Sequence, residues 1–340
     1  MNQVAFILNQ TTIYWYSIVL ALAVSAGVCF FMACCSHADI PPFWAAASAL
    51  LAVILSLVLS RLVFWYCRPD SFQSFTQALT ARTSGSLALA GSFLGCSLTA
   101  LILGKKAGGT GKLLDCMCIA GSCAICLGRL GCFFTSDDRG QILTEMAFLP
   151  WAYPVVNATS GELEYRLATF LFQAVISGVL FLVLCCLFFS PRIKKSLSDG
   201  RLTLLFAMVY SASQVILDST RYDSLYLRSN GFVSMVQVLS AVALAVSILL
   251  CSIGAVKAAG LKRWMVPVWV VITGLFGTAG YMEYYVQRHG RLAFFSYDVM
   301  EHCLVAIVVL GICLWKLSLK KQVPPEAVSS VTEESVQASL

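Results

Sequence analysis

The chain has 340 residues, of which 59% are hydrophobic and 12% charged, and its formal net charge is +6 at pH 7. Soluble domains carry about 25% charged residues, so the composition excludes a water-soluble globular protein. A helix needs about 20 apolar residues to cross the hydrocarbon layer of a membrane. In chain order, helices of this kind are expected at residues 12–33, 43–66, 84–104, 113–132, 167–189, 202–220, 232–254, 264–284 and 298–315. The sequence therefore predicts an all-α, polytopic transmembrane helix bundle of about nine spans.

The positions of the basic residues predict the orientation of these spans. Cytoplasmic loops of membrane proteins are enriched in lysine and arginine. All ten lysines lie in alternate connections or near the C-terminus: Lys105, Lys106, Lys112, Lys194, Lys195, Lys257, Lys262, Lys316, Lys320 and Lys321. We therefore expect the N-terminus outside and the C-terminus in the cytosol. The positive charge then reflects topology and contact with anionic membrane lipid, and nucleic-acid binding is not expected.

Fifteen cysteines, five of them between residues 116 and 132, raise the question of a metal site. These five lie in a predicted span, where a thiol behaves as a small, polarizable apolar group. Zinc and iron–sulfur sites usually occupy folded segments outside lipid, so we expect no metal or other cofactor. Few cysteines fall in outer loops, so a disulfide framework is not expected either.

Polar residues of six predicted spans fall at one depth, near the outer ends of the helices. At about 1.5 Å of rise per residue, Arg129 lies roughly 25 Å from the cytosolic end of its helix, within the outer leaflet. The other residues at this depth are Tyr16, Arg61, Gln173, Gln214, Asp218, Arg221 and Gln237. Ionisable residues at membrane depth are costly and by default mark a functional site. We therefore expect a polar site in the outer leaflet.

Arg129 is the most specific of these residues because it lies between Gly128 and Gly131, and glycines allow close approach of a backbone or a ligand. Two or three arginines in the outer leaflet suit a lipid phosphate, which a guanidinium binds through two hydrogen bonds. A structural alternative stays open. Arg61 can extend to lipid head groups, and Asp218 can pair with Arg221 to hold helices together.

Short motifs order these polar residues along the chain. Asp115 precedes Gly128-Arg129-Leu130-Gly131-Cys132-Phe133, which is followed by Asp137 and Gly140. Later come Tyr210, Gln214, Asp218 and Arg221, and then Gly231, Ser234, Gln237 and Ser240. Together with Trp15-Tyr16 and Ser60-Arg61-Leu62, these motifs resemble the signatures of the bacterial prolipoprotein diacylglyceryl transferase family over about residues 12–256.

The resemblance implies a division of the chain and a location. Residues 1–256 would form a seven-helix diacylglyceryl-transferase-like membrane core, residues 257–321 two additional transmembrane helices, and residues 322–340 a disordered cytosolic tail. The protein would be a multi-pass protein of the bacterial cytoplasmic membrane.

The resemblance also implies a reaction. The family moves the diacylglyceryl group of phosphatidylglycerol to the lipobox cysteine of a preprolipoprotein signal peptide. Arg129 would hold the lipid phosphate, with Arg61 or Arg221 as a second clamp. Tyr16, Gln214 and Gln237, with Gly128 and Gly131, would complete the substrate site. Asp218 and Asp137 are the candidates for the base that deprotonates the thiol, and no cofactor is implied.

Two family residues are replaced in this chain. The family's His-Gly-Gly-x-x-Gly segment corresponds to Ala90-Gly91-Ser92-Phe93-Leu94-Gly95, so its histidine is Ala90, and the arginine of its tyrosine motif is Gln214. The two additional helices could supply a base instead, because Glu301 and His302 are predicted about one turn inside the membrane. Besides an active transferase, two interpretations stay open: a non-catalytic or altered-acceptor phospholipid-binding relative, and a transporter.

Overall fold

The computed structural model describes residues 4–8, 11–72, 74–80, 87–135, 138–143, 151–157, 160–190, 199–221, 223–227, 230–289 and 293–319. Within these ranges, eight apolar helices are long enough to cross a membrane. They are α1 (Trp15–His37), α2 (Pro42–Cys67), α5 (Thr110–Leu130), α6 (Thr169–Phe189), α8 (Arg201–Ser219), α9 (Met235–Ala259), α10 (Met265–His289) and α11 (Ala293–Ser318). The predicted all-α, polytopic bundle is confirmed.

The remaining predicted span, at residues 84–104, corresponds to a shorter apolar helix. Helix α4 (Leu89–Leu103) has 15 residues, fewer than the roughly 20 that cross a bilayer alone. It packs against α2 at very close range, because a Cβ atom on Gly91 would lie 2.4 Å from the backbone of Leu59. A Cβ atom on Gly95 would lie 2.5 Å from the backbone of Ser56. Small residues permit this approach of two helix backbones in a membrane.

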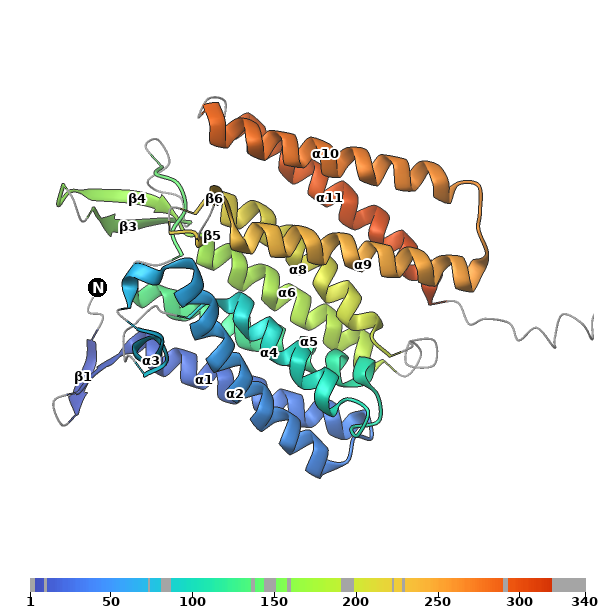
Figure 1. Ribbon diagram of the computed structural model, residues 1–340, viewed down its shortest axis with the longest axis horizontal. Coiled ribbons are helices and arrows are strands. Elements are labelled where there is room, and N and C mark those ends of the chain that lie inside the picture. Colours follow the sequence, from blue (N-terminus) through green and yellow to red (C-terminus); the bar gives the residue numbers. More distant parts are fainter. Residues whose placement is uncertain are drawn as a thin grey trace, which may run out of the picture.

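Three two-stranded antiparallel hairpins, which the sequence analysis did not predict, lie at the end of the bundle where α1 begins and α5 and α8 end (Figure 1). They pair β1 (Val4–Leu8) with β2 (Thr11–Tyr14), β3 (Ala152–Val156) with β4 (Leu163–Leu167), and β5 (Tyr226–Leu227) with β6 (Asn230–Ser234). Open sheet edges need water or protein partners for their backbone groups, so these hairpins mark an end that lies outside the hydrocarbon layer. We call it the hairpin end. The short elements η1 (Pro69–Ser71), α3 (Phe75–Thr80) and η2 (Gly131–Phe134) also lie in connections at this end.

Helices α10 and α11 form an outer layer on the bundle (Figure 1). Helix α11 packs against α8 and α9 as well as α10. At the far end, the indole nitrogen of Trp315 donates to the carbonyl oxygen of Arg201 at 2.8 Å. At the hairpin end, the Tyr297 hydroxyl donates to the carbonyl oxygen of Ser219 at 3.3 Å. Helix α11 is therefore joined to α8 at both of its ends.

Asp115 of α5 connects the core helices at the end opposite the hairpins. Its carboxylate accepts hydrogen bonds from the backbone nitrogens of Gly200 at 2.8 Å and Thr203 at 2.7 Å, and from the Thr203 hydroxyl at 2.7 Å. The first N–H groups of a helix have no partner within the helix. Asp115 satisfies the N–H of Thr203 in the first turn of α8 and that of Gly200 just before the helix, so this motif residue has a structural role.

Candidate functional site

Two arginines from different helices meet at one carboxylate at the hairpin end. Arg129 lies in the last turn of α5, and Arg221 follows the end of α8. Nη1 of Arg129 forms an ion pair with Oδ2 of Asp138, and Nη1 of Arg221 lies 2.6 Å from Oδ1 of the same residue. All three side chains are mostly buried. The predicted convergence of Arg129 and Arg221 is thus present, with Asp138 between them.

Asp138 is held in a defined position through its backbone. Its N–H donates to Oδ2 of Asp223 at 2.9 Å, and its carbonyl accepts from the Thr169 hydroxyl at 2.5 Å and from the backbone nitrogen of Phe170 at 3.3 Å. Its φ is 56°, a left-handed conformation that aspartate tolerates better than most residues. Burial disfavours the charged carboxylate, but Arg129 and Arg221 outweigh burial and hold the pKa of Asp138 at about 2. Asp138 is therefore ionised at neutral pH.

Asp218 and Asp223 complete the cluster around Arg221. Oδ1 of Asp223 lies 3.0 Å from Nε of Arg221, and Oδ1 of Asp218 lies 3.6 Å from its Nη1. The second oxygen of Asp218 accepts a hydrogen bond from the Ser234 hydroxyl. Asp218 is buried, with 2% of its surface exposed. The arginine–aspartate cluster (Arg129, Asp138, Asp218, Arg221 and Asp223) places three carboxylates around two guanidinium groups.

Arg139 fixes the turn that carries Asp138. Its guanidinium lies 4.1 Å from the ring centre of Tyr153 and 4.3 Å from that of Phe170. Its Nη2 donates to the carbonyl oxygens of Cys132 and Thr135, each at 2.7 Å, and the residue is fully buried. Aromatic rings stabilise a cation on their faces. Neither Arg139 nor Asp138 was predicted as a site residue. A signal was present in the sequence, because this charged dipeptide lies between Asp137 and Gly140, the two residues that follow the Arg129 motif.

The two glycines of the Arg129 motif face helix α1. A Cβ atom on Gly128 would lie 3.7 Å from Leu20, and one on Gly131 would lie 3.3 Å from Tyr16. Tyr16 and Phe133 both pack against a small apolar cluster of Cys132, Ala168 and Phe170. The space beside these glycines is thus occupied by α1, and Tyr16 lies next to the Arg129 motif.

Gln214 has a partner on the neighbouring helix. Its Oε1 accepts a hydrogen bond from Nε2 of Gln173 in α6 at 3.1 Å. Three buried polar atoms near this pair, Nε2 of Gln214, Oε1 of Gln173 and Oγ of Ser177, have no hydrogen-bond partner among the described residues. Buried polar atoms almost always have partners. The two amides thus form a polar contact between α6 and α8 that leaves further hydrogen-bonding capacity on both helices.

Gln237 connects the cluster to the additional helices. It forms a capping box with Ser234 at the start of α9, with both hydrogen bonds at 3.1 Å. Its Nε2 donates to Oε1 of Glu283 in α10 at 3.0 Å. Because Ser234 also bonds to Asp218, a continuous set of polar contacts runs from the cluster to α10.

The other predicted residues have different outcomes. Arg61 lies in the last two turns of α2. Asp137 lies outside the described residues. Ala90, which the resemblance places at the family's histidine position, lies at the start of α4. The hypothesis that Glu301 and His302 face the site is wrong, because both are exposed and the His302 side chain is 77% exposed. They lie on the outer face of α11, and Glu283 is the acidic residue of this pair of helices that faces the core.

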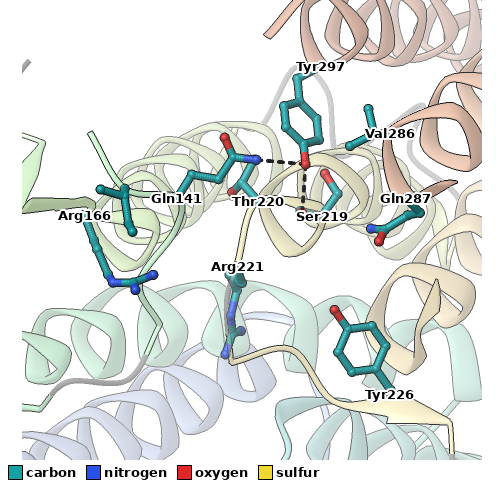
Figure 2. Close-up of a pocket in the computed structure, with 10 residues that line it drawn as sticks. Gln141, Arg166, Ser219, Thr220, Arg221, Tyr226, Val286, Gln287 and Tyr297 are labelled. Atoms are coloured by element: carbon teal, nitrogen blue, oxygen red, sulfur yellow. Dashed lines mark hydrogen bonds between the residues drawn. The ribbon is translucent and has the colours of Figure 1, made fainter. Parts of the chain in front are cut away.

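A pocket of about 380 Å³ adjoins the cluster (Figure 2). Its wall comes from the core on one side and from α10 and α11 on the other. The lining residues are Gln141, Ile142, Arg166, Ser219, Thr220, Arg221, Tyr226, Val286, Gln287 and Tyr297. Arg221 thus belongs both to the cluster and to the pocket. We call this cavity the interlayer pocket.

A helix bundle of this kind, with a buried ionic cluster and a polar pocket where its helices end, defines a polytopic membrane protein whose site lies at one membrane surface. The family model for prolipoprotein diacylglyceryl transferase matches residues 3–253. The chain therefore belongs to the prolipoprotein diacylglyceryl transferase family, as the motifs predicted, and it is a multi-pass protein of the bacterial inner membrane. The match ends before α10 begins.

Curated relatives agree with this assignment. Three of them are phosphatidylglycerol–prolipoprotein diacylglyceryl transferases. The protein from Trichormus variabilis is 26% identical over 226 residues, 65% of this chain and 79% of the relative. The one from Shouchella clausii is 27% identical over 251 residues, 70% of this chain and 86% of the relative. The one from Bacillus licheniformis is 23% identical over 269 residues, 78% of this chain and 96% of the relative.

Proposed function

We propose that this protein transfers the diacylglyceryl group of phosphatidylglycerol to the cysteine thiol of a prolipoprotein signal peptide. The names of its relatives state both the lipid and the protein substrate. The observation that carries the proposal is the meeting of Arg129 and Arg221 at one carboxylate. A pair of guanidinium groups that holds a carboxylate has the charge and geometry to hold a phosphate.

In the proposed reaction, the acceptor thiol loses its proton to a carboxylate of the cluster. Asp218 is our candidate for this base, and Asp137 remains a second one. The thiolate sulfur attacks the diacylglyceryl carbon that is bonded to the phosphate oxygen. A carbon–sulfur bond forms, the carbon–oxygen bond breaks, and glycerol phosphate leaves with the electron pair. Arg129 and Arg221 stabilise the departing phosphate charge, which is greater than in the intact diester.

We also propose that the hairpin end faces away from the cytosol. The described lysines of the connections, such as Lys105 and Lys262, lie toward the opposite end of the helices. The positive-inside tendency assigns that opposite end to the cytosol. The cluster would then lie in the outer leaflet, with the C-terminus in the cytosol.

Complementation tests the reaction. The gene is expressed in a bacterium depleted of its own diacylglyceryl transferase, with Arg129→Ala and Asp218→Asn as variants and Tyr281→Phe as control. Tyr281 lies on the lipid-exposed face of α10, with 59% of its surface exposed. We expect wild type and Tyr281→Phe to restore growth and lipid-modified lipoproteins, and the cluster variants to fail. Failure of the wild type, despite its insertion in the membrane, would refute transfer to that host's lipoproteins.

A second candidate function is phospholipid binding without transfer, or transfer to another acceptor. It is favoured by Ala90 and Gln214, which stand where the family has histidine and arginine, and by the excess of carboxylates in the cluster. Purified protein that binds phosphatidylglycerol but modifies no signal peptide in vitro would support this candidate.

A further inference from the structure

The interlayer pocket lies at the hairpin end, where helices of membrane-spanning length end and lipid head groups would lie. Its lining comes from helix ends: Ser219 closes α8, Gln287 lies in the last turn of α10, and Tyr297 lies in the first turns of α11. The hairpin strand β4 adds Arg166. Its volume of about 380 Å³ falls within the range of small-ligand sites, about 300–1,000 Å³.

Helices α10 and α11 are fixed to the core around this pocket. Gln141 Nε2 donates to the Tyr297 hydroxyl at 3.0 Å, and that hydroxyl donates to the Ser219 carbonyl (Figure 2). On the α10 side, Gln287 and Gln237 both donate to Oε1 of Glu283, at 2.9 and 3.0 Å. The wall that the additional helices contribute is therefore positioned by hydrogen bonds, as a binding site requires.

The remaining hydrogen-bonding capacity of the lining indicates the ligand. Among the described residues, no partner occupies the amide oxygens of Gln141 and Gln287, the Tyr226 hydroxyl or Nη2 of Arg221. The Tyr226 hydroxyl points toward the middle of the pocket (Figure 2). Burial and the carboxylates of Asp218 and Glu283 raise the pKa of Tyr226, so its hydroxyl keeps its proton at neutral pH.

Two free amide oxygens can only accept hydrogen bonds. A bare phosphate or carboxylate brings no donor to satisfy them, whereas alcohol hydroxyl groups both donate and accept. The guanidinium and phenol on the opposite side can donate to ligand oxygens. Just behind the wall, the second oxygen of the buried Glu283 carboxylate also has no partner among the described residues. All these groups suit a ligand rich in hydroxyl groups that also carries an anionic oxygen.

We propose that the interlayer pocket binds the hydroxyl-bearing head group of a membrane lipid, and that α10 and α11 give the protein selectivity for that head group. The inference rests on the proposed function only in taking the ligand to be a lipid rather than a soluble compound. It adds Gln287 and Tyr226 as residues that determine specificity.

Binding in phosphatidylcholine nanodiscs tests the proposal. The probes are dihexanoyl phosphatidylglycerol, dihexanoyl phosphatidic acid, which lacks the glycerol hydroxyls, and free glycerol 3-phosphate. We expect the wild type to prefer phosphatidylglycerol over phosphatidic acid by about tenfold, the effect of one or two hydrogen bonds. Equal affinity for these two lipids would overturn the proposal. Equal affinity for glycerol 3-phosphate and phosphatidylglycerol would overturn the claim that the ligand is a lipid rather than a soluble compound.

The variants Gln287→Leu and Tyr226→Phe should each reduce this preference, with phosphatidic acid binding unchanged. Tyr226→Phe removes a single oxygen and keeps the ring. It therefore still tests the pocket if Gln287→Leu disturbs folding. The control is Tyr281→Phe on the lipid-exposed face of α10. Unchanged preference in a folded Tyr226→Phe variant would overturn the assignment of this residue.

Transfer to a signal peptide is measured on the same proteins. A failure of the proposed transfer can then be distinguished from a failure of the proposed head-group pocket. Selective binding without transfer supports the pocket and refutes the proposed function. Transfer by a wild type that shows no preference between the two lipids refutes the pocket and leaves the proposed function in place.

Discussion

Nη1 of Arg221 lies 2.6 Å from Oδ1 of Asp138, so two loops that are far apart in the chain meet at a single buried carboxylate. The other oxygen of Asp138 pairs with Arg129. In this arrangement a side chain of the protein holds the position that a lipid phosphate would need. A phosphate that binds to Arg129 must therefore either share the guanidinium group with Asp138 or displace the Asp138 carboxylate.

The first prediction concerns the coupling between Arg129 and Asp138. Arg129→Ala leaves one oxygen of a buried carboxylate without its charged partner, and we expect a loss of about 1–3 kcal/mol in the free energy of unfolding. Adding Asp138→Asn should restore part of this loss because no unpaired charge remains. Thermal unfolding of the four proteins of this double-mutant cycle in detergent measures the coupling. An Arg129→Ala protein that is fully stable but no longer binds phosphatidylglycerol would show instead that phosphate is the partner of Arg129.

The second prediction is a pH dependence. The pKa of Asp138 falls from its ordinary 3.8 to about 2 in the folded protein, so the ionised form stabilises the fold. This contribution, about 2 kcal/mol for a shift of this size, is complete above about pH 5. It is lost as the pH falls from about 4 to 2. The difference in melting temperature between wild type and Asp138→Asn should therefore be constant from pH 5 to 7 and shrink below pH 4. A difference that stayed constant to pH 2.5 would contradict the assigned role.

The membrane spans could be predicted from the sequence because their signal is local. The expected helices at 167–189 and 202–220 correspond to α6 (Thr169–Phe189) and α8 (Arg201–Ser219) within two residues at each end. The first helix begins at Trp15 instead of residue 12, because Thr11–Tyr14 form β2. Short hairpins in polar connections carry no apolar run, and hydropathy therefore does not detect them.

The partner of Arg129 could not be predicted, because a shift of one residue along the chain decides which of two adjacent aspartates can pair with it. Asp137 and Asp138 are adjacent, and the left-handed backbone of Asp138 is part of the turn that carries its carboxylate. Arg139 depends on Tyr153 and Phe170, whose rings come from distant segments. Equally, no pattern in the sequence indicates that Glu283, rather than His302, faces the core. Which acidic or basic residue faces the core depends on which faces of α10 and α11 are turned toward α9.

The third prediction concerns the amide pair between α6 and α8. Gln214→Leu or Gln173→Leu alone leaves a buried amide without its partner, and we expect each variant to lose about 0.5–2 kcal/mol, typical of hydrogen bonds between membrane helices. The double variant should be more stable than either single variant, because two apolar side chains replace both polar groups. Ser25→Ala is the control, since that exposed hydroxyl bonds only to its own helix. Additive losses in the double variant would show that the two amides are not coupled.

The fourth prediction concerns the helix cap at the opposite end. Asp115→Ala removes the acceptor of three hydrogen bonds at the start of α8. We expect a loss of about 1–2 kcal/mol, as for other helix caps. Asp115→Asn keeps one side-chain oxygen as an acceptor and should lose less, and the exposed Asp199→Ala serves as the control. If Asp115→Ala abolished transfer while leaving thermal stability unchanged, Asp115 would have a role beyond the cap.

The last prediction tests the orientation on which the outer-leaflet site depends. In a variant without the native cysteines, single cysteines are placed at Ser160 and Arg288, near the hairpin end, and at Lys105 and Lys262, near the opposite end. All four positions are exposed, so accessibility is decided by the membrane and not by packing. A membrane-impermeant maleimide added to intact cells, with the outer membrane permeabilised where one is present, should label only the first pair, and lysis should allow labelling of all four. Labelling of Lys262→Cys in intact cells would reverse the orientation. The cluster would then lie in the cytosolic leaflet, away from the signal peptides that emerge on the outer face, and the proposed reaction could not take place there.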